Sequence, residues 1–241
     1  MRAPFSFIKA AGGAAFDPAT LALTGWWRAS YSASPWVGTA SAGASGTRDL
    51  TEATNPPSVG AAQNGLDPAD FDGTNDQMRI TLTLDDFVNA SAASAWVLFL
   101  ADTAAADAPA GQPYNNPAPL STANSGYFIV GYSDAGVRCA THDGAYREVT
   151  VAASTGAYHL AQVRIDGALL GVRVDSGSWS TTACGAIADL TSNPIFLGTN
   201  VDQTKYFDGR ILDVGLIDSV LSDVNFDNIK SYVNSRYALS L

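Results

Sequence analysis

Residues 206–218 read Y-F-D-G-R-I-L-D-V-G-L-I-D, an apolar run with small or charged residues between its large side chains. Strict alternation divides its positions between two faces of a strand, with Leu212, Val214 and Leu216 on one and Ile211, Gly215 and Ile217 on the other. Both faces are largely apolar, so the stretch predicts a central strand of a packed sheet. A second F-D-G triplet, at residues 71–73, also opens an apolar alternation.

Short apolar runs and turn residues alternate through the middle of the chain. We expect strands over residues 69–72, 78–84, 96–100, 127–132, 137–141, 146–151, 158–165, 168–174 and 195–198. Turn residues such as D-G at 143–144 and 166–167 separate neighbouring runs. A spacing of about 8–12 residues between such turns is typical of an antiparallel sandwich or barrel. The chain is therefore predicted to be all-β.

One helix is expected, at the end of the chain. Ser222 occupies an N-cap position, and Asp223 complements the helix dipole in the first turn. Apolar residues then recur at three- and four-residue spacing, at Phe226, Ile229, Val233 and Tyr237. This helix is predicted to place one apolar stripe on the β-structure.

The first twenty residues are predicted to form an arm, and residues 21–241 a single sandwich domain. Phe5, Phe7 and Ile8 form a short extended apolar run ahead of the Gly12-Gly13 pair. Apolar side chains are costly to leave in water, so this run is expected to dock. It docks either on its own domain or on a partner molecule, and the sequence leaves both open.

Composition and charge exclude several classes of function. The net charge is −10 with only 13 Lys and Arg residues, which argues against a nucleic-acid partner because phosphate binding depends on basic side chains. No run of about 18 apolar residues is present, so no membrane insertion is expected. Lys9 interrupts the apolar stretch that a signal peptide needs. Cys139 and Cys184 permit one disulfide at most, and small buried thiols are the simpler interpretation.

Several weak motifs, taken in order, resemble those of a known family. F-D-G-T-N-D at 71–76, then G-A-Y-H-L-A-Q-V-R-I-D-G from 156, I-F-L-G-T-N at 195–200 and Y-F-D-G-R-I-L-D-V-G from 206 are similar to laminin-G-like, concanavalin A-like lectin/glucanase domains. The resemblance covers roughly residues 21–240 and implies a jelly-roll sandwich of two antiparallel sheets. The opening L-T-G-W-W-R-A-S-Y resembles versions of this domain in bacteriophage virion proteins. Tyr158 departs from the tryptophan that many relatives carry there.

No catalytic set emerges from the sequence. Glycoside hydrolysis needs two carboxylates that flank one bond, but no E-x-D-x-E string exists, and Glu52 and Glu148 lie in unrelated segments. His142 and His159 have no Ser or Cys arrangement nearby in sequence that predicts a nucleophile. His159 falls on an otherwise apolar strand face and is predicted to be a hydrogen-bonded core histidine. The chain is therefore expected not to be an enzyme.

Two kinds of ligand site are predicted. Asp72, Asn75 and Asp76 supply oxygen ligands in one turn and are candidates for calcium, and Asp202 and Asp208 near the second F-D-G triplet are the alternative. Asp and Asn are also the residues that turns prefer. The family resemblance likewise implies calcium near a sheet rim. A glycan site would combine aromatic faces with amides, and its candidates are Trp36, Tyr114, Asn115, Asn116 and Trp179. Packing is the competing interpretation for the tryptophans. No other cofactor is expected.

The sequence favours a non-enzymatic structural component of a bacteriophage particle, as a capsid decoration or tail-associated protein. Its location is then the virion, and its partners are other virion proteins or further copies of itself. A carbohydrate-binding lectin module is the alternative, with a host-surface or extracellular glycan as ligand. A polysaccharide-degrading enzyme is a remote alternative, because the fold hosts such enzymes.

Overall fold

The computed structural model describes residues 16–40, 48–52, 54–103, 121–122, 128–133, 136–188, 190, 194–199 and 206–241. The strands in this part of the chain are β1 (Leu23–Arg28), β2 (Ser58–Val59), β3 (Ala69–Asp72), β4 (Met78–Thr83), β5 (Ala93–Ala101), β6 (Ser121–Thr122), β7 (Phe128–Ser133), β8 (Gly136–His142), β9 (Tyr146–Val151), β10 (Tyr158–Ile165), β11 (Leu169–Val174), β12 (Ser180–Ala183), β13 (Pro194–Leu197) and β14 (Asp208–Ile217). The helical elements are η1 (Pro18–Thr20), η2 (Leu84–Asp86) and α1 (Asp223–Tyr237).

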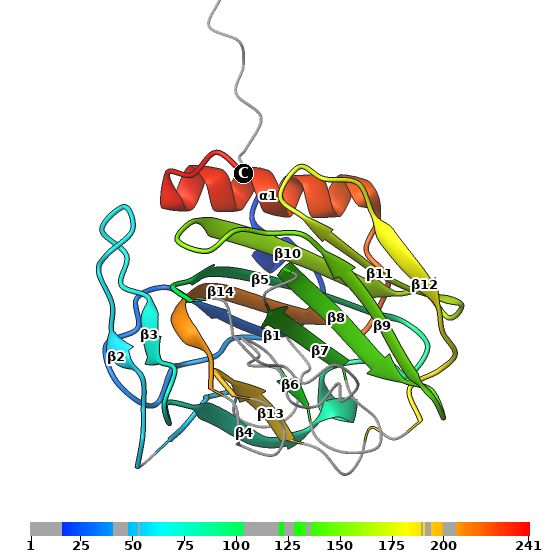
Figure 1. The fold of residues 1–241 in the computed structure, drawn as a ribbon, viewed down its shortest axis with the longest axis horizontal. Coiled ribbons are helices and arrows are strands. Elements are labelled where there is room, and N and C mark those ends of the chain that lie inside the picture. The colour runs from blue at the N-terminus through cyan, green and yellow to red at the C-terminus, as the bar shows by residue number, and fades with distance from the viewer. Residues whose placement is uncertain are drawn as a thin grey trace, which may run out of the picture.

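The strands form two layers, and every pairing is antiparallel (Figure 1). An eight-stranded sheet has the order β12-β11-β10-β5-β14-β3-β2, with β1 also paired to β14. Two three-stranded sheets, β4-β13-β6 and β7-β8-β9, make the opposite layer. The all-β sandwich with a C-terminal helix is therefore confirmed, with a second layer that is divided in two.

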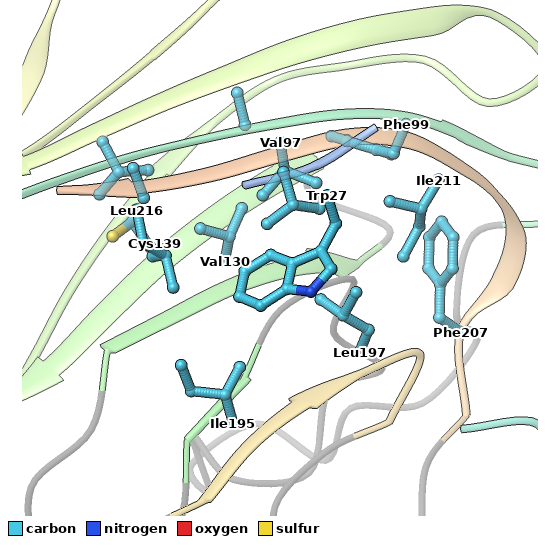
Figure 2. Packing of buried hydrophobic residues seen from close by; sticks show 14 of the residues in the cluster. Trp27, Val97, Phe99, Val130, Cys139, Ile195, Leu197, Phe207, Ile211 and Leu216 are labelled. Atoms are coloured by element: carbon cyan, nitrogen blue, oxygen red, sulfur yellow. The ribbon is translucent and has the colours of Figure 1, made fainter. Parts of the chain in front are cut away.

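Strand β5 shows how the large sheet is covered on both faces. Ala95, Val97 and Phe99 point into the core between the layers, whereas Trp96 and Leu98 point to the side of α1. All nine residues of β5 are buried, because one face packs on the opposite layer and the other on the helix. Figure 2 shows Trp27 of β1 in the middle of the inter-layer core, among side chains from both layers.

A second cluster lies between the large sheet and α1, and we call it the helix-side cluster. Its buried members are Leu23, Trp26, Ala29, Trp96, Leu98, Leu160, Leu212, Ile217, Leu221, Phe226, Ile229, Val233 and Tyr237. The predicted apolar stripe of the helix is thus confirmed. The predicted N-cap is also confirmed, since the hydroxyl of Ser222 accepts a hydrogen bond of 3.2 Å from the backbone N–H of Asn225.

The strict alternation predicted for β14 is wrong at one end. Leu212 belongs to the helix-side cluster, whereas Ile211 lies in the inter-layer core with Val214 and Leu216. The register against β5 shifts between Ile211, which faces Phe99, and Asp213, which faces Leu98. This bulge inserts one extra residue and reverses the faces of the residues before it.

The tryptophans and cysteines fit their packing interpretations. Trp26, Trp27 and Trp36 are all buried. Cys139 is buried in the inter-layer core, and Cys184 packs partly buried against the same cluster. Both thiols are free, and burial raises the pKa of Cys139. Among the described residues, no helix has both the length and the apolar character that a membrane crossing requires.

Candidate functional site

A hollow of about 650 Å³ opens beside the C-terminal half of α1, and we call it the α1 hollow. It is lined by Phe16, Asp17, Asn64, Leu66, Ser231, Tyr232, Ser235 and Arg236. The apolar members, Phe16, Leu66 and Tyr232, are half-buried and pack against the helix-side cluster. The two serines, Asp17 and Asn64 are exposed. The hollow therefore joins apolar side chains with hydroxyl, amide, carboxylate and guanidinium groups.

A tight turn at residues 63–66 forms one wall of the hollow. Asn64 and Gly65 both have positive φ, of 52° and 74°, which is the backbone of a two-residue hairpin turn. The side-chain amide of Gln63 donates to the carbonyl of Tyr237 at 2.7 Å, and that of Asn64 donates to the carbonyl of Arg236 at 2.8 Å. These amides satisfy carbonyls that the end of a helix leaves free, so the turn is fastened to α1.

Tyr232 lines the hollow together with Arg236 and packs on Trp26, over which Arg28 also lies. Its ring packs on Trp26 with 6.0 Å between centroids, and its hydroxyl oxygen is buried without a hydrogen-bond partner among the described residues. Burial and the charge of Asp213 raise the pKa of Tyr232, and the charges of Arg236 and Arg28 oppose this. The phenol therefore keeps its proton and remains a donor.

The two guanidinium groups are held by neutral contacts. That of Arg28 lies 4.2 Å from the centroid of the Trp26 ring. Arg236 donates through Nη2 to the carbonyl of Ala29 at 3.4 Å and through Nε to the hydroxyl of Tyr237 at 3.3 Å. Among the residues that the structure describes, neither arginine has a carboxylate within ion-pair distance.

Asp213 anchors the helix beneath the hollow. Its carboxylate is fully buried, and Oδ1 accepts hydrogen bonds of 2.8 Å from the indole N–H groups of both Trp26 and Trp96. The hydroxyl of Tyr237 lies 2.9 Å from Oδ2. Burial raises the pKa of Asp213 to about 6, although the three hydrogen bonds act in the opposite direction. Asp213 thus connects β1, β5, β14 and α1, which is a structural role.

The predicted glycan residues are placed apart. Trp36 is 3% exposed, its ring packs edge-on against Tyr31, and its indole N–H donates to the carbonyl of Arg28 at 3.0 Å. It lines a smaller hollow of about 230 Å³, where its buried ring offers little face for a sugar. Trp36 belongs to the inter-layer core, whereas Trp179 packs against the helix-side cluster. The structure does not bring the two rings together.

Trp179 is half-buried and fastens the start of α1. Its indole N–H donates to Asp223 at 3.0 Å, and its ring meets that of Phe226 edge-on at 5.1 Å. The guanidinium of Arg164 lies 4.2 Å from its centroid and pairs with the same aspartate at 2.7 Å. The other predicted glycan residues, Tyr114, Asn115 and Asn116, lie outside the described residues. The predicted docking residues, Phe5, Phe7 and Ile8, also lie outside them.

The predicted calcium residues form a turn between β3 and β4. Oδ1 of Asp72 accepts from the backbone N–H groups of Thr74, Asn75 and Asp76, and Oδ2 of Asp76 accepts from the N–H of Asp72 at 3.0 Å. Burial and the charge of Asp72 raise the pKa of Asp76 to about 6. Within the described ranges, no three His, Cys, Asp or Glu side chains gather as a metal site. The turn explains these residues, and calcium stays a prediction.

His159 lies in a Ser–His–Asp arrangement that the sequence spacing did not reveal. Its Nδ1 is 2.7 Å from Asp175 Oδ2, and its Nε2 is 3.3 Å from Ser154 Oγ. However, Nε2 is nearer to the carbonyl oxygen of Ser154, at 3.1 Å, and a carbonyl is only an acceptor. The ring therefore donates there and does not take the hydroxyl proton. His159 is hydrogen-bonded at both nitrogens, as predicted. It connects the loop at Ser154, before β10, to the turn at Asp175, after β11.

Glu52 and Glu148 do not form a pair. Glu52 accepts a hydrogen bond from the N–H of Thr54 at 2.9 Å, whereas Glu148 forms an ion pair of 3.2 Å with Arg138. The α1 hollow itself was missed by sequence reasoning. The Asn64-Gly65 pair is a recognisable turn signal, and Tyr232 lies beside the apolar stripe of the helix, but their proximity depends on how the turn docks on α1.

Comparisons with known proteins identify the fold. No family model matches the chain, and no curated protein matches its sequence. Solved structures do match. Domain 4 of AbnA, an extracellular arabinanase from Geobacillus stearothermophilus solved with arabinotriose, has a TM-score of 0.56 and 11% identity over 76% of this chain and 82% of that one.

Two further structures match over more of the chain. The receptor-binding domain of botulinum neurotoxin mosaic serotype C/D has a TM-score of 0.60 at 9% identity over 88% of this chain. An arabinofuranosidase solved with arabinofuranosyl-α-1,2-xylobiose has a TM-score of 0.53 at 15% identity over 83%. The chain spans 51% of the length of each. At these identities the similarity establishes a shared lectin-like β-sandwich fold.

Proposed function

We propose that the chain is a non-catalytic saccharide-binding domain and that the α1 hollow holds the sugar. The observation that carries the proposal is the lining of the hollow. Phe16, Leu66 and Tyr232 offer apolar surface to the C–H faces of a sugar ring, and exposed Ser231 and Ser235 offer hydroxyl groups. A small number of polar groups on an apolar surface is the usual composition of a ligand site.

The structural neighbours give weaker, independent support. The arabinanase domain was solved with arabinotriose, and the arabinofuranosidase with a pentose trisaccharide. Both share the sandwich with this chain. Arabino- and xylo-oligosaccharides are therefore sensible first probes, to be followed by a broad glycan array.

The test is a titration calorimetry series with Ser235→Tyr. Ser235 is exposed on α1 and lines the hollow, so a tyrosine there fills the hollow at little cost in stability. We expect affinity for any saccharide that the wild type binds to fall at least about tenfold, equivalent to about 1.4 kcal/mol.

Val224→Tyr is the matched control. Val224 is 67% exposed in the first turn of the same helix and lies outside the hollow, so this variant should bind as the wild type does. Equal loss in both variants, or wild-type binding by Ser235→Tyr, would place the sugar elsewhere. An array on which the wild type binds no saccharide would contradict the proposal altogether.

As a second candidate we propose that the domain is a non-enzymatic part of a bacteriophage particle and is located in the virion. Its support is the opening L-T-G-W-W-R-A-S-Y at residues 23–31 and the apolar run of Phe5, Phe7 and Ile8. The two proposals are compatible, because a particle protein can also bind saccharides. Capsid or tail genes on both sides of the coding sequence would support it, and a neighbourhood of cellular genes alone would contradict it.

A further inference from the structure

We infer that the α1 hollow selects saccharides that carry a carboxylate, such as uronic acids. This inference rests on the proposed function and names the class of ligand for the same site. It is carried first by Arg236, which lines the hollow and has no carboxylate partner among the described residues. Arg28 likewise has no such partner; it lines the neighbouring smaller hollow, and its guanidinium lies over the Trp26 ring on which Tyr232 packs.

Several other arginines on the same protein do have a carboxylate partner. Arg164 pairs with Asp223 and Arg173 with Asp227, each at 2.7 Å, and Arg147 pairs with Asp143 at 3.0 Å. The chain has 23 acidic residues against 13 basic ones, so carboxylates are plentiful. Arg28 and Arg236 therefore place two guanidinium groups without a carboxylate partner near the packed pair of Trp26 and Tyr232.

The contacts of Arg236 hold its guanidinium in place without neutralising it. Its two bonds, of 3.4 Å to the Ala29 carbonyl and 3.3 Å to the Tyr237 hydroxyl, are long and go to neutral acceptors. The charge of the buried Asp213 also acts on Arg236, but that carboxylate is enclosed and bonded to the indoles of Trp26 and Trp96. A pre-positioned guanidinium loses little freedom when it binds a carboxylate through paired N–H groups.

The remaining polar groups of the hollow are two serines, Asn64 and one aspartate. The hydroxyl of Ser235 can donate to a ligand, whereas Ser231 donates its one proton to the carbonyl of Asp227 at 2.9 Å and offers the ligand an acceptor. Asp17 is the acidic residue of the lining. Its Oδ1 accepts from the N–H of Ala19 at 3.0 Å as the N-cap of η1, and its exposure leaves its charge screened by solvent.

The experiment compares each oligosaccharide with its own uncharged form. Oligomers of galacturonate, glucuronate and mannuronate, and their fully methyl-esterified counterparts, are titrated into the full chain by calorimetry at low and high salt. The ester keeps the sugar rings and removes the charge. We expect at least one free acid to bind at least about tenfold more tightly than its ester, and the difference to shrink as salt rises.

Variants locate the effect. Arg236→Gln should remove most of the preference for the acid, and Arg28→Gln, which leaves the Tyr237 contact intact, should reduce it independently. Arg164→Gln removes an arginine whose charge is already paired and should keep the full preference. Thermal denaturation checks that each variant is folded. If Arg236→Gln is not folded, Arg236→Lys takes its place, because lysine retains the charge and loses the paired N–H geometry.

The outcomes separate this inference from the proposed function. If acid and ester bind equally, and Ser235→Tyr abolishes both, the hollow binds neutral sugars and the inference is wrong while the proposed function stands. If the preference survives in both arginine variants, the charge that selects the acid lies elsewhere. If no saccharide binds the wild type, both the inference and the proposed function fail.

Discussion

Asp213 of β14 accepts a hydrogen bond of 2.8 Å from the indole of Trp96 on β5, at a point where both side chains are completely buried. Gly215, two residues further along β14, is the cross-strand partner of Trp96. The indole therefore lies over a glycine and donates to a carboxylate two residues away. This contact connects the middle of the large sheet to the anchor of α1 and, through it, to the α1 hollow.

Replacement of Asp213 should separate hydrogen bonding from charge. Asp213→Ala leaves two buried indole N–H groups without their acceptor, at a cost of about 1–3 kcal/mol for each. It also removes the nearer of two acceptors of the Tyr237 hydroxyl, the other being the carbonyl of Leu212 at 3.2 Å. We expect Asp213→Ala to lower the free energy of unfolding by at least about 3 kcal/mol. Asp213→Asn keeps an acceptor for the indoles and an N–H donor for the hydroxyl, and should cost far less. Urea denaturation of both variants at pH 7 measures this, and equal losses would contradict it.

The same carboxylate should make stability depend on pH. The pKa of Asp213 is about 6 in the folded protein and 3.8 as its ordinary value, so the folded state holds the proton more tightly. Its contribution is fully present below pH 3.8 and is lost as pH rises through 6, by about 3 kcal/mol at 1.36 kcal/mol per pKa unit. The wild type should therefore lose stability relative to Asp213→Asn between pH 4 and 7. Asp76 has a pKa of about 6 as well, and its contribution to the pH dependence is the same in both proteins, so it cancels in the difference.

Gly215→Ala should be strongly destabilising. A Cβ at this position would lie 2.1 Å from two ring carbons of Trp96, far inside van der Waals contact. The indole cannot move without losing its bond to Asp213, so we expect a loss of about 3 kcal/mol in thermal or chemical denaturation. Gly185→Ala is the control, because its nearest contact would be an ordinary 3.5 Å. Similar losses in both variants would contradict the close packing of Trp96.

His159 should titrate above its ordinary pKa of 6.5, chiefly because of its hydrogen bond to Asp175. Its raised pKa contributes stability that is fully present below pH 6.5 and is lost as pH rises through the folded value. Asp175→Asn should lower the pKa of His159 toward 6.5. Asparagine tolerates the positive φ of 56° at this position, so the backbone should be kept. NMR titration of the two histidines measures this, and an unchanged midpoint for His159 would contradict the role of Asp175.

The local elements of the fold were largely predictable because they depend on neighbouring residues. Ser222, Asp223 and the apolar spacing of α1 fall within a few turns of one helix, and the structure has them as predicted. Strands β9 and β10 begin and end where their alternation and flanking turns indicate. The face assignment of Leu212 was wrong, because the bulge in β14 is a property of its pairing with β5.

The candidate site could not be predicted, because it is formed by contacts between residues that are far apart in the sequence. Trp36 and Trp179 were grouped as aromatic candidates, and the structure packs them in different clusters. Ser154 and Asp175 meet His159 only because a loop and a turn converge at the end of β10. The role of Asp213 was not predicted, because its three hydrogen-bond partners come from β1, β5 and α1.

The order of apolar and polar residues alone determined that this chain is an all-β sandwich closed by a C-terminal helix, because period and turn chemistry act over a few residues. Tertiary structure decided which side chains are buried together and which unpaired charges share a surface. The α1 hollow brings Phe16, Asn64 and Tyr232 together from three distant segments. Their proximity depends on how the sheets and the helix pack, and it cannot be deduced from the order of residues along the chain.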